Sequence, residues 1–239
     1  MKRENKKNGI YCRYIKRLLD ILMALTGMLL LSWLYLIVAI LVRIKLGKPV
    51  IFKQKRPGKI DRHTGKERLF TLYKFRSMKD ATDRYGHKLT EEQRILLTQQ
   101  EGFDAVSSDE ERVTKFGRKI RELSLDEIPE LYNILKGDMS FVGPRPLEVA
   151  YLPYYTEEER HRHDVLPGLT GLAQVNGRNI ISWEERFRYD LEYVNNVSFL
   201  MDLRILCKTI AVVWKHDDTE IPLEGENSVA LSDLRRNKE

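Results

Sequence analysis

The sequence predicts a mostly helical α+β protein, with one globular domain fixed to a membrane by an N-terminal helix. Three observations predict it: an uncharged apolar stretch from Ile21 to Val42, a short β-rich region after it, and two runs of helical apolar spacing over 113–136 and 183–215. A chain of 239 residues suits one domain with an attachment. We divide it into residues 1–48, the basic N-terminus and membrane helix, residues 49–215, the globular domain, and residues 216–239, a polar tail.

Charge is distributed unevenly along the chain. The net charge is +6, but the first 59 residues carry a balance of +12 and the remainder −6. A nucleic-acid-binding protein spreads its basic residues over the folded surface, whereas here they bracket one apolar segment, so a membrane surface is the favoured partner and nucleic acid is not. Cys12 and Cys207 are the only cysteines, which excludes a disulfide framework or a thiolate zinc site and favours the reducing, cytoplasmic side.

The apolar stretch meets the length of about 20 residues needed to cross a bilayer core. A secretory signal peptide would have a shorter apolar core and a cleavage site, so we expect the segment to be retained. Basic clusters at residues 1–17 and 43–59 favour a re-entrant helix that keeps both flanks on the cytoplasmic face, with a single-pass anchor as the alternative. Ser32 lies at the midpoint and can support a bend by binding a backbone carbonyl.

The region after the membrane segment predicts a β-hairpin, with turns at Pro57-Gly58 and Thr64-Gly65. Residues 79–112 are polar and contain one helix candidate, which opens at Thr90 with Gln93 completing a capping box and ends near Gly102. This segment is either a lid or a plain connection.

The last helical run predicts either an interfacial amphipathic helix or a buried core helix. Apolar residues recur there near helical spacing, with Lys208 and Lys215 between them. These residues are Val197, Leu200, Met201, Ile205 and Trp214.

The densest group of reactive residues lies around the adjacent acids Asp126 and Glu127. Ser124 and Glu127 match a capping box, which is a purely structural interpretation. Pro129 opposes a helix capped at Ser124, because its ring would clash one turn back, and a start near Asp126 fits better. The helix dipole would then keep Asp126 ionised and leave Glu127 able to help hold a divalent cation.

Basic residues elsewhere could neutralise a diphosphate substrate: Lys74, Arg76, Arg121 and Arg145. Taken singly, such residues are usually surface groups or salt-bridge partners. Arg145 stands apart because Pro144 and Pro146 fix the backbone on both sides.

Five strings then identify a family. FKQKRPGK, LYKFRSM, RVTKFGRKIRELSLDEIPELYNILKGDMSFVGPRPL, LPGLTGLAQVNGRN and YDLEYVNNVSFLMDLRIL occur in an order that resembles bacterial sugar transferases, the monotopic phosphoglycosyltransferases. The resemblance covers residues 14–215 and is to the small, single-domain members. It implies transfer of a sugar-1-phosphate from a UDP-sugar to membrane polyprenyl (undecaprenyl) phosphate, with release of UMP, at the cytoplasmic face of a bacterial inner membrane, as the initiating step of surface glycan assembly.

The resemblance also implies roles for single residues. Asp126 would be the nucleophile, through an aspartyl-phosphosugar intermediate, and Asp126 with Glu127 would hold Mg²⁺. The predicted substrate-binding residues are Lys74, Arg76, Arg121, Pro144, Arg145, Pro146, Gln174, Asn176 and Arg178.

Two departures from the family pattern accompany the resemblance. Ser32-Trp33 stands where members often carry a helix-breaking Ser-Pro, and Leu172 stands where many carry Trp. His161 and His163 are interpreted as surface residues and not as metal ligands, because a spacing of two does not place them on one helix face.

The competing interpretation is a non-catalytic, polybasic membrane adaptor whose acids and arginines form only surface ion pairs. The sequence defines neither the oligomeric state nor the sugar, and closeness to the small members favours a UDP-N-acetylated hexose.

Overall fold

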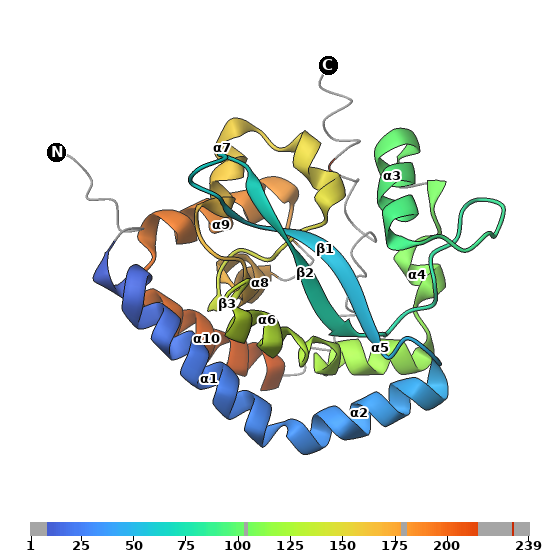
Figure 1. Ribbon diagram of the computed structural model, residues 1–239. Helices are drawn as coiled ribbons and strands as arrows, with labels where there is room; N and C mark the ends of the chain where they lie inside the picture. Colours follow the sequence, from blue (N-terminus) through green and yellow to red (C-terminus); the bar gives the residue numbers. More distant parts are fainter. Residues whose placement is uncertain (1–8, 103–104, 178–180, 215–230, 232–239) are drawn as a thin grey trace.

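The computed structural model describes residues 9–102, 105–177, 181–214 and 231 (Figure 1). It confirms a mostly helical α+β architecture. A bent helix pair lies along one side of the molecule, and a β-hairpin crosses its middle (Figure 1). The predicted tail, residues 216–239, lies outside the described residues except for Leu231, which is buried against Trp183 and Phe187.

The apolar segment forms two helices and not one. A π-helical turn (η2, Tyr11–Ile15) leads into α1 (Lys16–Leu30), which is bent by 64° from α2 (Ser32–Lys45). Among the described residues no single helix is both long and apolar enough to cross a bilayer, whereas this bent pair passes when its halves are taken together. The Ser32 hydroxyl donates to the Leu29 carbonyl at 2.8 Å, as predicted, and so satisfies a carbonyl at the bend.

The bent pair is bound to the domain through polar contacts of α1. Asp20 is buried and accepts bonds from the Phe141 amide and the Ser140 hydroxyl, while Arg17 donates to two carbonyls at the end of α6 (Glu130–Lys136). Gly27 allows close approach, because an added Cβ would lie 3.3 Å from Leu131. The bent pair is therefore packed directly against the core of the globular domain.

The hairpin pairs β1 (Ile51–Ile60) with β2 (Glu67–Phe75) in antiparallel register. Thr64-Gly65 forms the turn as predicted, but the turn predicted at Pro57-Gly58 is wrong. These two residues lie inside β1, where the register shifts between Pro57 and Ile60 and the backbone absorbs Gly58 as a strand irregularity. The hairpin is held to α6 by the buried Asn133 side chain, which donates to the Thr71 carbonyl and accepts from the Tyr73 amide.

The polar segment after the hairpin contains α3 (Glu91–Glu101), with the predicted capping box at Thr90 and the predicted end at Gly102. Its Arg94 is buried and lies 2.7 Å from Glu148, which ties the helix to the domain. The short helix α4 (Asp109–Arg112) follows. In this structure α3 is thus docked by a buried ion pair.

The remaining elements complete the domain. They are α5 (Lys115–Glu122), η4 (Leu125–Glu127), β3 (Ser140–Val142), η5 (Val149–Tyr154), α7 (Glu157–Arg160), η6 (His161–Asp164), β4 (Gly168–Thr170), α8 (Leu172–Gly177), α9 (Trp183–Asn196) and α10 (Phe199–Trp214). Strands β3 and β4 pair in parallel. The surface position predicted for His163 is wrong, because it is buried against the Tyr155 ring; burial lowers its pKa to about 3, while His161 is exposed as predicted.

Helix α10 packs one face into the core, as the buried-core alternative predicts, and its interfacial placement stays a prediction. Val197, which precedes it, and Ile205 are buried in the core, whereas the opposite face carries exposed apolar side chains. Those exposed residues are Phe199, Leu200, Leu203 and Ile210. The Tyr11 hydroxyl and Lys16 both contact Asp202, so α10 lies beside the start of α1 (Figure 1) and adds an apolar surface next to that of the bent pair.

Candidate active site

The two acids lie in a 3₁₀ turn that precedes a helix. Ser124 has a left-handed backbone (φ 53°) and its side chain makes no capping bond, so the capping box predicted at Ser124 is wrong. Pro129 stands at the N-cap of α6, and the α-helix begins only at Glu130. A start near Asp126 is therefore correct for the 3₁₀ turn but not for the α-helix, because the proline ring excludes a continuous helix through this point.

Glu127 is held by two cations. Lys74 Nζ lies 2.9 Å from Glu127 Oε1, and both terminal nitrogens of Arg145 lie 3.2 Å from the same oxygen. Lys74 reaches this point because alternation along β2 puts it on the same face as the buried Phe70 and Leu72. Burial alone would raise the pKa of Glu127, but Lys74 and Arg145 outweigh it and lower the pKa to about 2.

Asp126 differs from its neighbour. It is 6 % exposed, and its carboxylate makes no hydrogen bond or ion pair with any described residue. Burial raises its pKa from 3.8 to about 6, against the opposing field of Lys74. A carboxyl with this pKa is still mostly ionised at pH 7, as expected, but desolvation outweighs the effect expected from the helix dipole, because α6 begins four residues later. A buried, unpartnered carboxylate suits attack on an electrophile.

Both acids line a cavity of about 770 Å³. Apolar residues of α1 contribute to its lining, among them Leu22, Met23 and Leu30. The lining also contains four cations: Lys74, Arg121, Arg145 and Arg186. A cavity lined by both apolar and cationic side chains suits a substrate with a hydrocarbon chain and a phosphate.

The structure brings together most of the predicted site residues. Lys74, Arg121, Arg145 and Gln174 line the cavity with Asp126 and Glu127. The Gln174 Oε1 atom is buried without a described partner, which leaves an acceptor available to a ligand.

Arg145 occupies a fixed position. Pro144 and Pro146 are buried on either side of it, and its carbonyl accepts a bond of 2.8 Å from Arg162. Arg162 is itself buried and paired with Asp190 at 2.7 Å. The backbone that carries Arg145 is thus anchored by prolines and by an internal ion pair.

Four predicted residues do not line this cavity, and a fifth lies outside the described residues. Pro144 and Pro146 flank Arg145 without lining the cavity. Arg76 follows Phe75, the last residue of β2. Its guanidinium donates to the Lys48 carbonyl, just after the end of α2, and to the Asp80 carboxylate. Asn176 accepts from Lys208 and donates to the Leu172 carbonyl within the helical region. Arg178 lies outside the described residues.

Sequence reasoning missed three residues of the site. Glu130 is 2 % exposed and lies 3.1 Å from Lys74, and burial raises its pKa to about 7. Arg186 and Asp190 line the cavity from α9. Glu130 could have been noticed as a third acid only three residues after Glu127, whereas α9 carries no sequence signal that places it at the acids.

The acids are compatible with the expected magnesium ion. Within the described ranges there is no cluster of three or more His, Cys, Asp or Glu side chains that could hold a metal. Mg²⁺ commonly binds one or two carboxylates and completes its shell with water and substrate phosphates. Asp126 and Glu127 supply such a pair, so the residues fit the ion, and the Mg²⁺ site remains a prediction.

The bacterial sugar transferase profile matches residues 11–216. The chain belongs to the bacterial sugar transferase family. Membership confirms the prediction of an enzyme, a phosphoglycosyltransferase, over the non-catalytic adaptor.

This sugar transferase has relatives of two lengths. It is 49% identical over 199 residues to the uncharacterized sugar transferase EpsL of Bacillus subtilis. This match covers 83% of this chain and 87% of EpsL. It is 38% identical over 205 residues to the undecaprenyl-phosphate galactose phosphotransferase of Salmonella typhimurium. It is 34% identical over 206 residues to the UDP-N-acetylgalactosamine-undecaprenyl-phosphate N-acetylgalactosaminephosphotransferase of Aeromonas hydrophila. These matches cover 86% and 84% of this chain but only 41% and 44% of those longer relatives.

Proposed function

We propose that this sugar transferase moves a sugar-1-phosphate from a UDP-sugar to undecaprenyl phosphate, with release of UMP, and so begins the assembly of a surface polysaccharide. The names of the Salmonella and Aeromonas relatives support undecaprenyl phosphate as acceptor, and the Aeromonas name supports a UDP-sugar as donor. The observation that carries the proposal is Asp126, a buried carboxylate without a hydrogen-bond or ion-pair partner among the described residues, in a cavity lined by cations and by apolar residues of α1.

In the first step the Asp126 carboxylate attacks the phosphorus that bears the sugar. A bond forms between a carboxylate oxygen and phosphorus, the bond from that phosphorus to the UMP oxygen breaks, and UMP leaves with the electron pair. Lys74, Arg121 and Arg145 neutralise the charge that develops on the phosphate oxygens. Mg²⁺, when bound at Asp126 and Glu127, supplies further neutralisation of the diphosphate.

In the second step a phosphate oxygen of undecaprenyl phosphate attacks the same phosphorus. The bond to Asp126 breaks, the carboxylate is restored, and the product is undecaprenyl diphosphate sugar. The apolar residues of α1 in the cavity allow the hydrocarbon chain of the acceptor to lie in the lipid while its phosphate reaches Asp126. Two sequential displacements at one site also allow UMP to leave before the acceptor enters.

The test is UMP release by the purified full chain with a panel of UDP-sugars, with and without undecaprenyl phosphate. We expect sustained turnover only with both substrates, and loss of turnover in Asp126→Asn, because an amide cannot form the acyl phosphate. Glu122→Gln is the matched control, because Glu122 is an exposed acid four residues away that does not line the cavity. Turnover by Asp126→Asn at more than a few per cent of wild type would exclude Asp126 as the nucleophile.

A further inference from the structure

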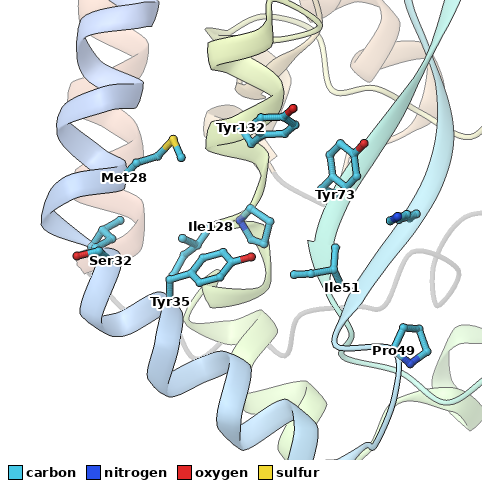
Figure 2. Close-up of a pocket in the computed structure, with 11 residues that line it drawn as sticks. Met28, Ser32, Tyr35, Pro49, Ile51, Tyr73, Ile128 and Tyr132 are labelled. Atoms are coloured by element: carbon cyan, nitrogen blue, oxygen red, sulfur yellow. The ribbon is translucent and has the colours of Figure 1, made fainter.

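A second cavity, of about 740 Å³, lies between the bent helix pair and the hairpin (Figure 2). It shares only Leu31 and Ile128 with the cavity that holds Asp126. Figure 2 shows Met28 and Tyr35 extending from the bent pair toward Ile128 and Tyr132, with residues of the hairpin on the far side. The volume falls within the range of about 300–1,000 Å³ that is usual for ligand sites.

The lining of this second cavity combines an apolar surface with a few polar groups. Met28, Leu31, Ile51 and Ile128 supply aliphatic surface, and no acidic side chain lines the cavity. The hydroxyls of its three tyrosines make no hydrogen bond with any described residue; they are Tyr35, Tyr73 and Tyr132. Tyrosine rings with a free polar end are typical of sites that join an apolar and a polar phase.

Lys53 is the cation of this lining. It is exposed on β1, its ammonium lies 6.0 Å from the centre of the Tyr73 ring, and it has no acidic partner within the described part of the chain. A lysine that is not neutralised by the protein attracts an anion. The charge of the cavity therefore complements a ligand with an apolar body and a negatively charged head.

The bent helix pair, which forms one side of the cavity, indicates that such a ligand comes from the membrane. The bent pair carries exposed apolar side chains on both arms, including Leu29, Trp33 and Ile44, and it is the segment that meets the apolar criteria for a membrane. A cavity with one wall on this segment is continuous with surrounding lipid. Undecaprenyl phosphate is the weaker candidate, because its phosphate must reach Asp126 in the first cavity.

We propose that this second cavity binds an acyl chain of an anionic membrane phospholipid, whose phosphate is held by Lys53. The site is separate from the one that performs the transfer, and it rests on the membrane attachment that the proposed function requires. A bound lipid would fill the space between the bent pair and the hairpin, and so support the angle between α1 and α2.

The test uses the full chain in nanodiscs that contain a phosphatidylglycerol with a photoreactive group on its acyl chain. Peptides from the cavity are then identified by mass spectrometry, with no turnover measured, so that failure of the lipid site and failure of the transferase proposal are distinguishable. We expect Lys53→Gln to lower labelling of these peptides about fivefold, the effect of one basic residue at an anionic surface, and Lys53→Arg to retain it. Lys55→Gln is the matched control, because Lys55 is exposed on the same face of β1 but does not line the cavity.

A photoreactive phosphatidylcholine and an excess of undecaprenyl phosphate complete the experiment. The proposal expects several-fold weaker labelling by phosphatidylcholine and no displacement by undecaprenyl phosphate. Unchanged labelling in Lys53→Gln, or equal labelling by the two phospholipids, would overturn the anionic lipid site. Displacement by undecaprenyl phosphate would overturn it too and assign the cavity to the chain of the acceptor.

Discussion

The pH dependence of the first chemical step should report the raised pKa of Asp126. Burial places this pKa at about 6 instead of 3.8. The carboxylate is the attacking form, so the rate must rise with pH through the pKa and level off above it. At pH 5 about one-tenth of a group with a pKa of 6 is ionised, whereas more than about nine-tenths would be ionised at a pKa of 3.8. We therefore expect about a tenfold loss of rate at pH 5 relative to the plateau.

The assay is single-turnover release of UMP in the absence of undecaprenyl phosphate. Leaving out the acceptor matters because a phosphate monoester itself titrates near pH 6 and would add its own limb to the profile. Glu130→Gln is the matched control, since burial raises the pKa of Glu130 to about 7 and it is the nearby acid that could imitate the effect. The limb should stay near pH 6 in this variant. A limb near pH 4, or one that disappears in Glu130→Gln, would refute the assignment to Asp126.

Three further predictions concern the phosphate contact, the hairpin and the topology. Arg145→Lys should lower kcat/KM about 10- to 150-fold despite keeping the charge, because loss of one charge-assisted hydrogen bond costs about 1.5–3 kcal/mol; steady-state kinetics equal to wild type would contradict a fork contact. Asn133→Leu should lower the free energy of unfolding by about 1–3 kcal/mol, measured by denaturant titration, since it leaves two partly buried backbone groups of β2 unpaired. An unchanged midpoint would show that those groups find other partners. Single cysteines at Arg13 and Lys48, both exposed, in a variant without native cysteines, should both be protected from an impermeant thiol reagent in intact cells if the bent pair is re-entrant, and labelling of one alone would establish a spanning pair.

Features encoded by short sequence patterns were predictable. The capping box at Thr90 and the Gly102 end of α3 depend on side chains three residues apart and on a glycine, and they form as expected. The bend near Ser32 was expected from the basic flanks and from a hydroxyl that can bind a carbonyl, even though no proline stands there. Both features are stabilised by hydrogen bonds between residues that are close in the sequence, which is why the sequence could predict them.

Features that depend on tertiary burial were not predictable. The sequence places Asp126 and Glu127 side by side, yet their pKa values shift in opposite directions, because Lys74 and Arg145 form ion pairs with Glu127 and not with Asp126. The capping motif at Ser124 is present in the sequence but is not used, since its backbone is left-handed. A sequence motif does not specify the path of the backbone through the core, and that path decides whether the capping bond forms.

The predicted basic residues illustrate the same limit. Lys74 and Arg76 lie two apart on β2 or just after it, and the sequence gives no reason to treat them differently. The structure directs Lys74 into the cavity and Arg76 toward the carbonyl of Lys48 at the end of the membrane segment. Arg162 is the converse case: it stands between two histidines that suggest a surface, but it is buried and supports the Arg145 backbone.

The proposed covalent bond between Asp126 and the sugar phosphate can be detected before the acceptor is added. The full chain is mixed with a UDP-sugar in the absence of undecaprenyl phosphate and quenched, and UMP and the mass of each peptide are determined. We predict a burst of UMP no larger than the enzyme concentration and a sugar-phosphate adduct on the peptide that contains Asp126, with neither in Asp126→Asn. Release of UMP only after undecaprenyl phosphate is added, or an adduct on another residue, would contradict the covalent role of Asp126.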